Sequence, residues 1–120
     1  MVAFLRTVML QLLAWSCLAV IGVLSLLPSA YVKRTGFGGH LEHFVAYLLT
    51  AGMFCLAYRS RRQSITIAIG LAAAAALFEI GQSFSPGRAP GLGDWMASTT
   101  GVVAGAFCGF LVARHLQSRD

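Results

Sequence analysis

The chain has 120 residues, enough for one domain, and its composition is 58% hydrophobic and only 11% charged. Soluble domains carry about 25% charged residues, so this composition argues against a soluble fold and predicts an integral membrane protein. The formal net charge is +5, but the basic residues cluster between apolar runs and do not interleave with aromatic residues, which argues against nucleic acid as a partner.

Four apolar runs approach or reach the length of about 20 residues that a helix needs to cross a bilayer core. They cover residues 8–27, 41–58, 65–84 and 95–113. The first run exceeds the ~7–15 residues of a signal-peptide core, so we expect it to remain as a helix. Prolines and glycines interrupt the chain after the first and third runs. The sequence therefore predicts one domain, residues 1–120, with an all-α fold: a four-transmembrane-helix bundle.

The orientation of this bundle follows from the basic residues in the gaps, because cytoplasmic loops carry an excess of Lys and Arg. The gaps on one side contain Arg6, Arg59, Arg61, Arg62, Arg114 and Arg119, and those on the other contain Lys33, Arg34 and Arg88. We therefore predict a multi-pass protein of the cell membrane with both termini in the cytoplasm. The gaps near 36–43 and 85–94 then face outward.

The fourth run carries Gly101, Gly105 and Gly109 at intervals of four residues, which places them on one helix face. Such a stripe lets another backbone approach closely. We expect it to pack against a neighbouring helix of the same chain. Homo-oligomer formation through the same stripe is the alternative.

The second run opens with polar residues. His40, His43 and Tyr47 have the spacing of one helical face, and Glu42 lies off that line. The simplest interpretation is that the histidines and Glu42 occupy the hydrated interface and cap the helix, since an acid near a helix N-terminus is favourable by ~0.3–1 kcal/mol.

The third run ends with Glu79 and Gln82, which share a helix face. Glu79 follows a long apolar stretch and needs a partner or a proton inside a membrane; Arg88 and the histidines are the candidates. A structural Glu–Arg or Glu–His bridge is one outcome. Arg88 can also bind a phosphate or a carboxylate with its planar fork. Asp94 lies where a helix N-cap is expected.

Together these residues resemble the signature of the VanZ-like family. The matching positions are His43 and Tyr47, Glu79 and Gln82, Pro86-Gly87-Arg88, Asp94 and Gly101. The resemblance covers about residues 39–105, and it departs from the family in two places: Gly39-His40 replaces a common Asp-Lys pair, and Ser98 replaces a common Asn. It implies a small multi-helix membrane protein of the cell envelope, linked to teicoplanin-type antibiotic resistance, but it supplies no reaction.

We expect an outward-facing polar pocket that recognises an anionic lipid-linked or peptidoglycan-related group and affects glycopeptide susceptibility. Its expected ligand-binding residues are His43, Tyr47, Glu79, Gln82, Arg88 and Asp94. The partners would be membrane lipids and a lipid-linked cell-wall precursor or an envelope protein. One alternative is an intramembrane enzyme that uses His43 and Glu79 for acid–base chemistry. Another is a purely structural module. No metal-binding spacing occurs, so we expect no metal and no cofactor.

Overall fold

Four long helices form the fold in the computed structural model, which describes residues 1–33 and 35–119. They are α1 (Val2–Leu26), α2 (Gly39–Ala57), α3 (Arg61–Gln82) and α4 (Leu92–Gln117), with a 3₁₀ turn at Ser29–Tyr31. Each is long and apolar enough to cross a membrane. Among the described residues there is no β-strand. The predicted all-α fold with four membrane-compatible helices is confirmed.

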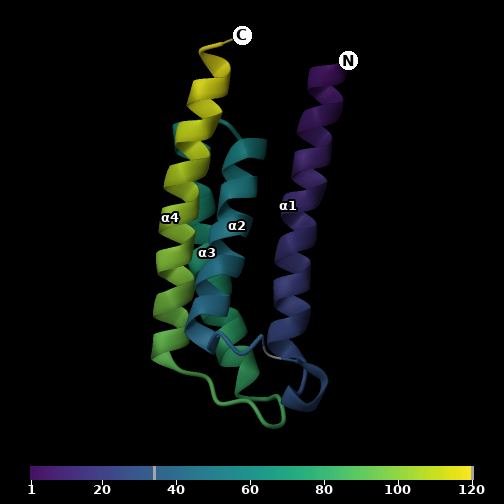
Figure 1. Cartoon of the computed structure of the whole chain (residues 1–120), viewed down its shortest axis with the longest axis vertical. Coiled ribbons are helices and arrows are strands. Elements are labelled where there is room, and N and C mark those ends of the chain that lie inside the picture. Colours follow the sequence, from purple (N-terminus) through teal and green to yellow (C-terminus); the bar gives the residue numbers. More distant parts are fainter. Residues whose placement is uncertain (34, 120) are drawn as a thin grey trace.

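The helices run alternately up and down an elongated bundle of 49 × 24 × 24 Å (Figure 1). α2 and α4 form the most extensive helix pair, and α1 contacts α2 and α3 but not α4. Both termini and the turn at 58–60 lie at one end, called the terminal end below. The connections formed by residues 27–33, 35–38 and 83–91 lie at the opposite end, called the loop end (Figure 1).

The helices extend beyond the apolar runs that predict them. α1 begins at Val2, α3 at Arg61 and α4 at Leu92, several residues earlier than hydropathy indicates. Hydropathy marks only the apolar part of a helix, whereas backbone hydrogen bonding continues through polar residues. At α3 a capping box fixes the true start: the Gln63 amide donates to Ser60 Oγ at 3.1 Å, and the Ser60 amide donates to Gln63 Oε1 at 3.4 Å.

The glycine stripe of α4 is buried against α2. A Cβ added at any of its three positions would press on the α2 backbone: Gly101 against Phe44, Gly105 against Leu48, and Gly109 against Gly52. The prediction that the stripe packs within the chain is confirmed. Because α2 fills the stripe, a second copy of the chain would have to displace α2 to use it.

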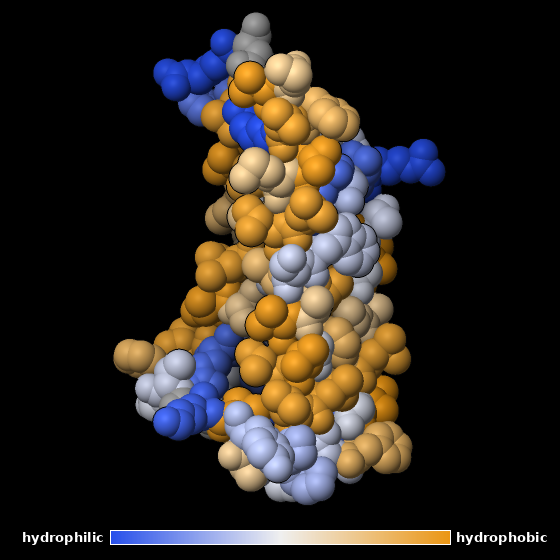
Figure 2. All heavy atoms as spheres, turned by 90° about the vertical axis from the view of Figure 1, so that its right-hand side faces the viewer, coloured by the Kyte–Doolittle hydropathy of each residue, from blue (hydrophilic) through white to orange (hydrophobic). Residues whose placement is uncertain are grey.

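The core is small and most large apolar side chains point outward. It consists of Ala14, Tyr47, Ala51, Phe54, Cys55, Leu71, Ala75, Val102 and Ala106. The flank of the bundle is largely hydrophobic over its middle and hydrophilic toward both ends (Figure 2). In lipid, burying apolar surface does not drive helices together, so close packing and polar contacts must hold them. Polar contacts are concentrated at the loop end.

Candidate functional site: the loop-end pocket

The loop before α4 closes the C-terminal end of α1. Arg88 donates from Nε to the Leu27 carbonyl at 3.0 Å and from Nη2 to the Leu24 carbonyl at 2.6 Å. Ser85 Oγ donates to the Leu26 carbonyl at 2.6 Å. The last carbonyls of a helix have no partner within the helix, and a cation there also interacts favourably with the helix dipole. Arg88 is therefore anchored to α1.

A glycine makes this closure possible. Gly87 has φ +74°, and a Cβ there would collide with the Ser29 side chain. Glycine adopts this backbone conformation without steric cost. The Ser29 amide also donates to the Pro86 carbonyl at 3.1 Å. The connection after α1 and the connection before α4 are therefore held together, and this contact fixes the position of Arg88 beside the end of α1.

A cavity of about 250 Å³ opens beside Arg88 and is called the loop-end pocket below. Its lining consists of Ile21, Leu24, Ser25, Val32, Lys33, Thr35, Glu42, His43, Ala46, Tyr47, Gln82 and Arg88. Four of the six predicted site residues are in this lining: His43, Tyr47, Gln82 and Arg88. Tyr47 and Gln82 are deeply buried, with 2% and 4% of their surface exposed.

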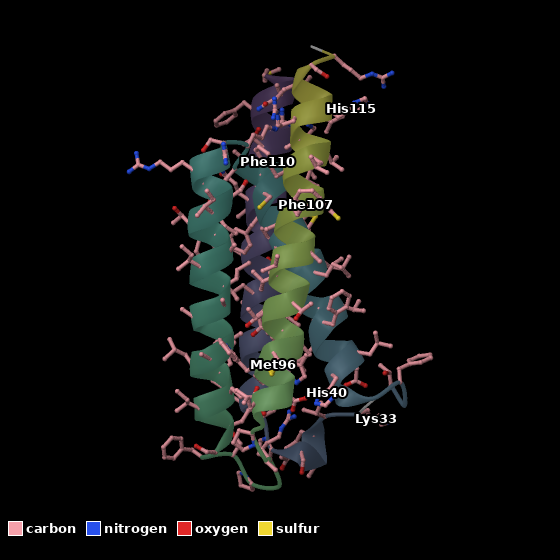
Figure 3. The ribbon with its side chains drawn as sticks, turned by 90° about the vertical axis from the view of Figure 1, so that its left-hand side faces the viewer. Lys33, His40, Met96, Phe107, Phe110 and His115 are labelled. Carbon is pink, nitrogen blue, oxygen red and sulfur yellow. The ribbon has the colours of Figure 1, made fainter. Side chains whose placement is uncertain are left out.

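The charges around the pocket come from both loops and from α2. Lys33 and Arg88 contribute two cations, and Glu42 contributes one carboxylate. Glu42 Oε1 accepts hydrogen bonds from the amide and the hydroxyl of Thr35, at 2.8 and 2.6 Å. Figure 3 shows Lys33 at the loop end, near the start of α2. The lining therefore combines a held carboxylate with two cations.

Asp94 lies outside this lining and contacts both histidines of α2. Its Oδ1 is 3.3 Å from His40 Nε2, and its Oδ2 is 4.0 Å from His43 Nε2. The expectation that Asp94 is the N-cap is wrong: Gly91 is the N-cap and Asp94 lies in the first turn of α4. An acid in the first turn is still favoured by the helix dipole. Asp94 ties the start of α4 to the start of α2.

His43 also contacts Ser98, with 3.3 Å between Nδ1 and the Ser98 Oγ. This arrangement resembles a catalytic triad, with Ser98 in the place of the nucleophile, His43 in that of the base and Asp94 in that of the carboxylate. Ser98 is only 1% exposed, and 4.0 Å is too long for a hydrogen bond between His43 and Asp94. Ser98 therefore orients the imidazole and does not face a substrate.

Glu79 also lies outside the pocket lining. Its Oε1 accepts a hydrogen bond from the Gly91 amide at 2.9 Å. It lines a separate groove with Trp95, Pro90 and Leu92 on the outer side of α3 and α4. Of the partners considered for Glu79, neither Arg88 nor a histidine forms an ion pair with it among the described residues: Arg88 donates to the end of α1, and the histidines of α2 lie beside Asp94.

The six predicted site residues therefore occupy one end of the bundle but not one cavity. Lys33, Ser25 and Thr35 line the pocket and were missed. In the sequence, Lys33 indicates only the orientation of the chain in the membrane. No pattern in the sequence shows that the loop after α1 folds back over α2. Within residues 1–33 and 35–119, no three His, Cys, Asp or Glu side chains are grouped so as to hold a metal ion.

Comparisons of the chain with protein-family models, with curated proteins and with solved structures found no match. The VanZ-like resemblance consequently rests on the motif residues alone.

Proposed function

We propose that this chain is a VanZ-like integral membrane protein of the cell envelope whose loop-end pocket binds the anionic head group of a lipid-linked or peptidoglycan-related molecule. The observation that carries the proposal is the meeting of Lys33 and Arg88, from two different loops, in one cavity with His43, Tyr47 and Gln82. The proposed consequence of binding is altered glycopeptide susceptibility.

The donors in the lining suit a phosphate or a carboxylate. A guanidinium has five N–H donors, and Arg88 uses two of its N–H groups to donate to the Leu24 carbonyl of α1 and to the carbonyl of its C-cap, Leu27. Anchoring these two fixes the plane of the fork before a ligand arrives, which lowers the entropy lost on binding. Lys33 adds a flexible ammonium, and Gln82 and Tyr47 add neutral hydrogen-bonding groups. Because the lining contains two cations and one carboxylate, it favours binding of an anion.

The size of the pocket limits what it can enclose. Its volume of about 250 Å³ lies below the ~300–1,000 Å³ typical of pockets for drug-sized ligands. The pocket therefore accommodates a head group, while the rest of a lipid-linked molecule would remain in the leaflet or the solvent outside it.

The proposed orientation places this pocket on the outer face of the membrane. Six of the nine basic residues of the sequence flank the terminal end, whereas Lys33 and Arg88 lie in the loop-end connections, and the positive-inside rule favours the side with more as the cytoplasmic side. Reporter fusions after Gln63 and after residue 120 should then both give a cytoplasmic signal. An external signal at both positions would place the pocket inside the cell.

A second candidate is an acid–base enzyme centred on His43. One observation favours it: the imidazole lines the pocket while it contacts Ser98 and approaches Asp94. In this version Ser98 orients the imidazole, and Asp94 rather than Glu79 is the carboxylate near the base. Turnover of an added lipid-linked substrate, lost in His43→Ala, would separate this candidate from a binding protein.

The deciding experiment compares binding of a polyprenyl phosphate and the uncharged polyprenol to the purified chain in nanodiscs. Lys33→Gln removes one cation from the lining, and Arg6→Gln removes one from the exposed surface of α1 at the terminal end. A charge-assisted hydrogen bond contributes about 1.5–3 kcal/mol, so Lys33→Gln should weaken phosphate binding roughly 10-fold or more. Equal binding of the polyprenol, or equal effects of the two substitutions, would refute the proposal.

A further inference from the structure

A second groove lies between α3 and α4 at the terminal end and has a volume of about 450 Å³. The residues that line this α3–α4 groove are Arg61, Ser64, Ile65, Ala68, Val103, Ala106, Phe107, Phe110, Leu111 and Arg114. Ser64 and Ala106 are buried and form its floor, whereas Ile65, Phe107 and Leu111 are exposed. Figure 3 shows Phe107 and Phe110 in the half of α4 nearer the termini. The groove is therefore apolar and open to the side.

Two arginines from different helices stand at the terminal end of this groove. Arg61 begins α3, and Arg114 lies in the last turn of α4, with its Cζ 5.8 Å from the centre of the Phe110 ring. A guanidinium at that distance is attracted by the ring, which holds it over the groove wall. Both arginines are exposed.

Among the described residues, the acids all lie far from these arginines. Glu42 is in the first turn of α2, Asp94 is in the first turn of α4, and Glu79 is near the end of α3, which places all three toward the loop end. The fourth acid of the sequence, Asp120, is outside the described part of the chain. The two cations at the groove therefore have no carboxylate beside them within residues 1–33 and 35–119.

The length of the groove matches one leaflet. Helices rise about 1.5 Å per residue, so the α4 wall from Val103 to Arg114 is roughly 16 Å long, about half of a ~30 Å hydrocarbon core. The two arginines lie at one end of the groove, and its mostly apolar lining continues from them over this length. An acyl chain with an anionic phosphate above it has the complementary shape and charge.

We infer that the α3–α4 groove binds an anionic diacyl phospholipid from the leaflet at the terminal end, with the phosphate between Arg61 and Arg114 and an acyl chain along Val103 and Phe107. This site lies at the other end of the bundle from the loop-end pocket and does not depend on the function proposed for that pocket. A zwitterionic phospholipid has the same tails, but its ammonium offsets the charge of the phosphate.

Native mass spectrometry of the full chain, released from detergent with phosphatidylglycerol or phosphatidylcholine, tests the inference. The variant R61Q/R114Q loses both groove cations. The matched control R6Q/R119Q loses two exposed arginines that do not line the groove. Retention of phosphatidylglycerol should fall by about fivefold for each groove arginine removed, and that of phosphatidylcholine should not change. Equal losses in the two variants would mean diffuse attraction only and would overturn the inference.

A second pair of variants tests the apolar part with both arginines in place. Val103→Trp fills the groove, and Val112→Trp adds the same bulk at an exposed α4 position outside it. Val103→Trp should reduce retention of phosphatidylglycerol several-fold while Val112→Trp leaves it unchanged. Unaltered retention in Val103→Trp would show that no acyl chain occupies the groove, which would overturn the inference even if the arginine variants behaved as expected.

Discussion

His40 Nε2 and Asp94 Oδ1 lie 3.3 Å apart and join the first turn of α2 to the first turn of α4. The His40 side chain is 73% exposed, and exposed ion pairs contribute only about 0–1 kcal/mol. Asp94 contributes more to the stability of the fold than its ion pair with His40 alone, because it also lies near His43 and at the positive end of the α4 dipole.

Asp94→Asn should therefore destabilise the protein more than His40→Ala. We expect a loss of about 1–2 kcal/mol for Asp94→Asn, from the dipole and from the two histidine contacts, and less than about 1 kcal/mol for His40→Ala. Thermal unfolding in detergent, followed by circular dichroism, measures both. If His40→Ala costs as much as Asp94→Asn, the contact with His43 and the dipole contribute nothing.

Arg88 has two roles that substitutions can separate. Arg88→Gln removes the cation that caps α1 through Leu24 and Leu27 and should lower stability by about 1.5–3 kcal/mol. Lys33→Gln, in the same pocket, has no cap to lose in the structure and should leave stability within about 0.5 kcal/mol. Comparing unfolding midpoints with ligand binding for both variants therefore distinguishes the cap from the pocket. Equal stability of the two variants would show that Arg88 does not hold α1.

The sequence predicts the helices well and their polar ends less well. Hydropathy and the spacing of Gly101, Gly105 and Gly109 report local periodicity, so they correctly indicate four helices and one buried glycine face. The partner of Glu79 depends on the path of the loop at 85–91, which brings the Gly91 amide to Glu79 and takes Arg88 to α1. Charge complementarity alone could not predict that a backbone amide and backbone carbonyls would be the partners.

The same limit explains the missed pocket residues. Lys33 and Thr35 lie in a connection with no periodic pattern, and they face the pocket because Ser29 is locked to Pro86 and Gly87. That contact joins segments more than fifty residues apart in the chain. Only the folded arrangement reveals it, whereas His43 and Tyr47 follow directly from helical spacing.

The glycine stripe offers a sharp test of how α2 and α4 are held together. Gly105→Ala places a Cβ against the Leu48 carbonyl of α2, where the backbone cannot yield without moving the helix, and Gly105→Leu adds further bulk. We expect Gly105→Ala to cost about 1–3 kcal/mol and Gly105→Leu to cost more. Gly70→Ala is the matched control, because nothing lies within 4 Å of its added Cβ; it should be neutral or stabilise by up to about 1 kcal/mol. Similar unfolding midpoints for Gly105→Ala and Gly70→Ala would mean that the α2–α4 contact is looser than described.

Glu79 provides the last test. Its hydrogen bond with the Gly91 amide predicts that two substitutions that both remove the charge differ in their effect on stability. In Glu79→Gln the side-chain oxygen can still accept the Gly91 amide at the start of α4, whereas Glu79→Ala leaves that amide without its partner. The bond is partly buried, and a fully buried donor left unpaired costs about 1–3 kcal/mol, so Glu79→Ala should unfold at a lower temperature than Glu79→Gln. Since Glu79 does not line the loop-end pocket, Glu79→Gln should also retain binding of a polyprenyl phosphate. If Glu79→Gln folded normally yet lost that binding, the carboxylate would belong to the ligand site, and the loop-end pocket would extend to the separate groove that Glu79 lines with Trp95.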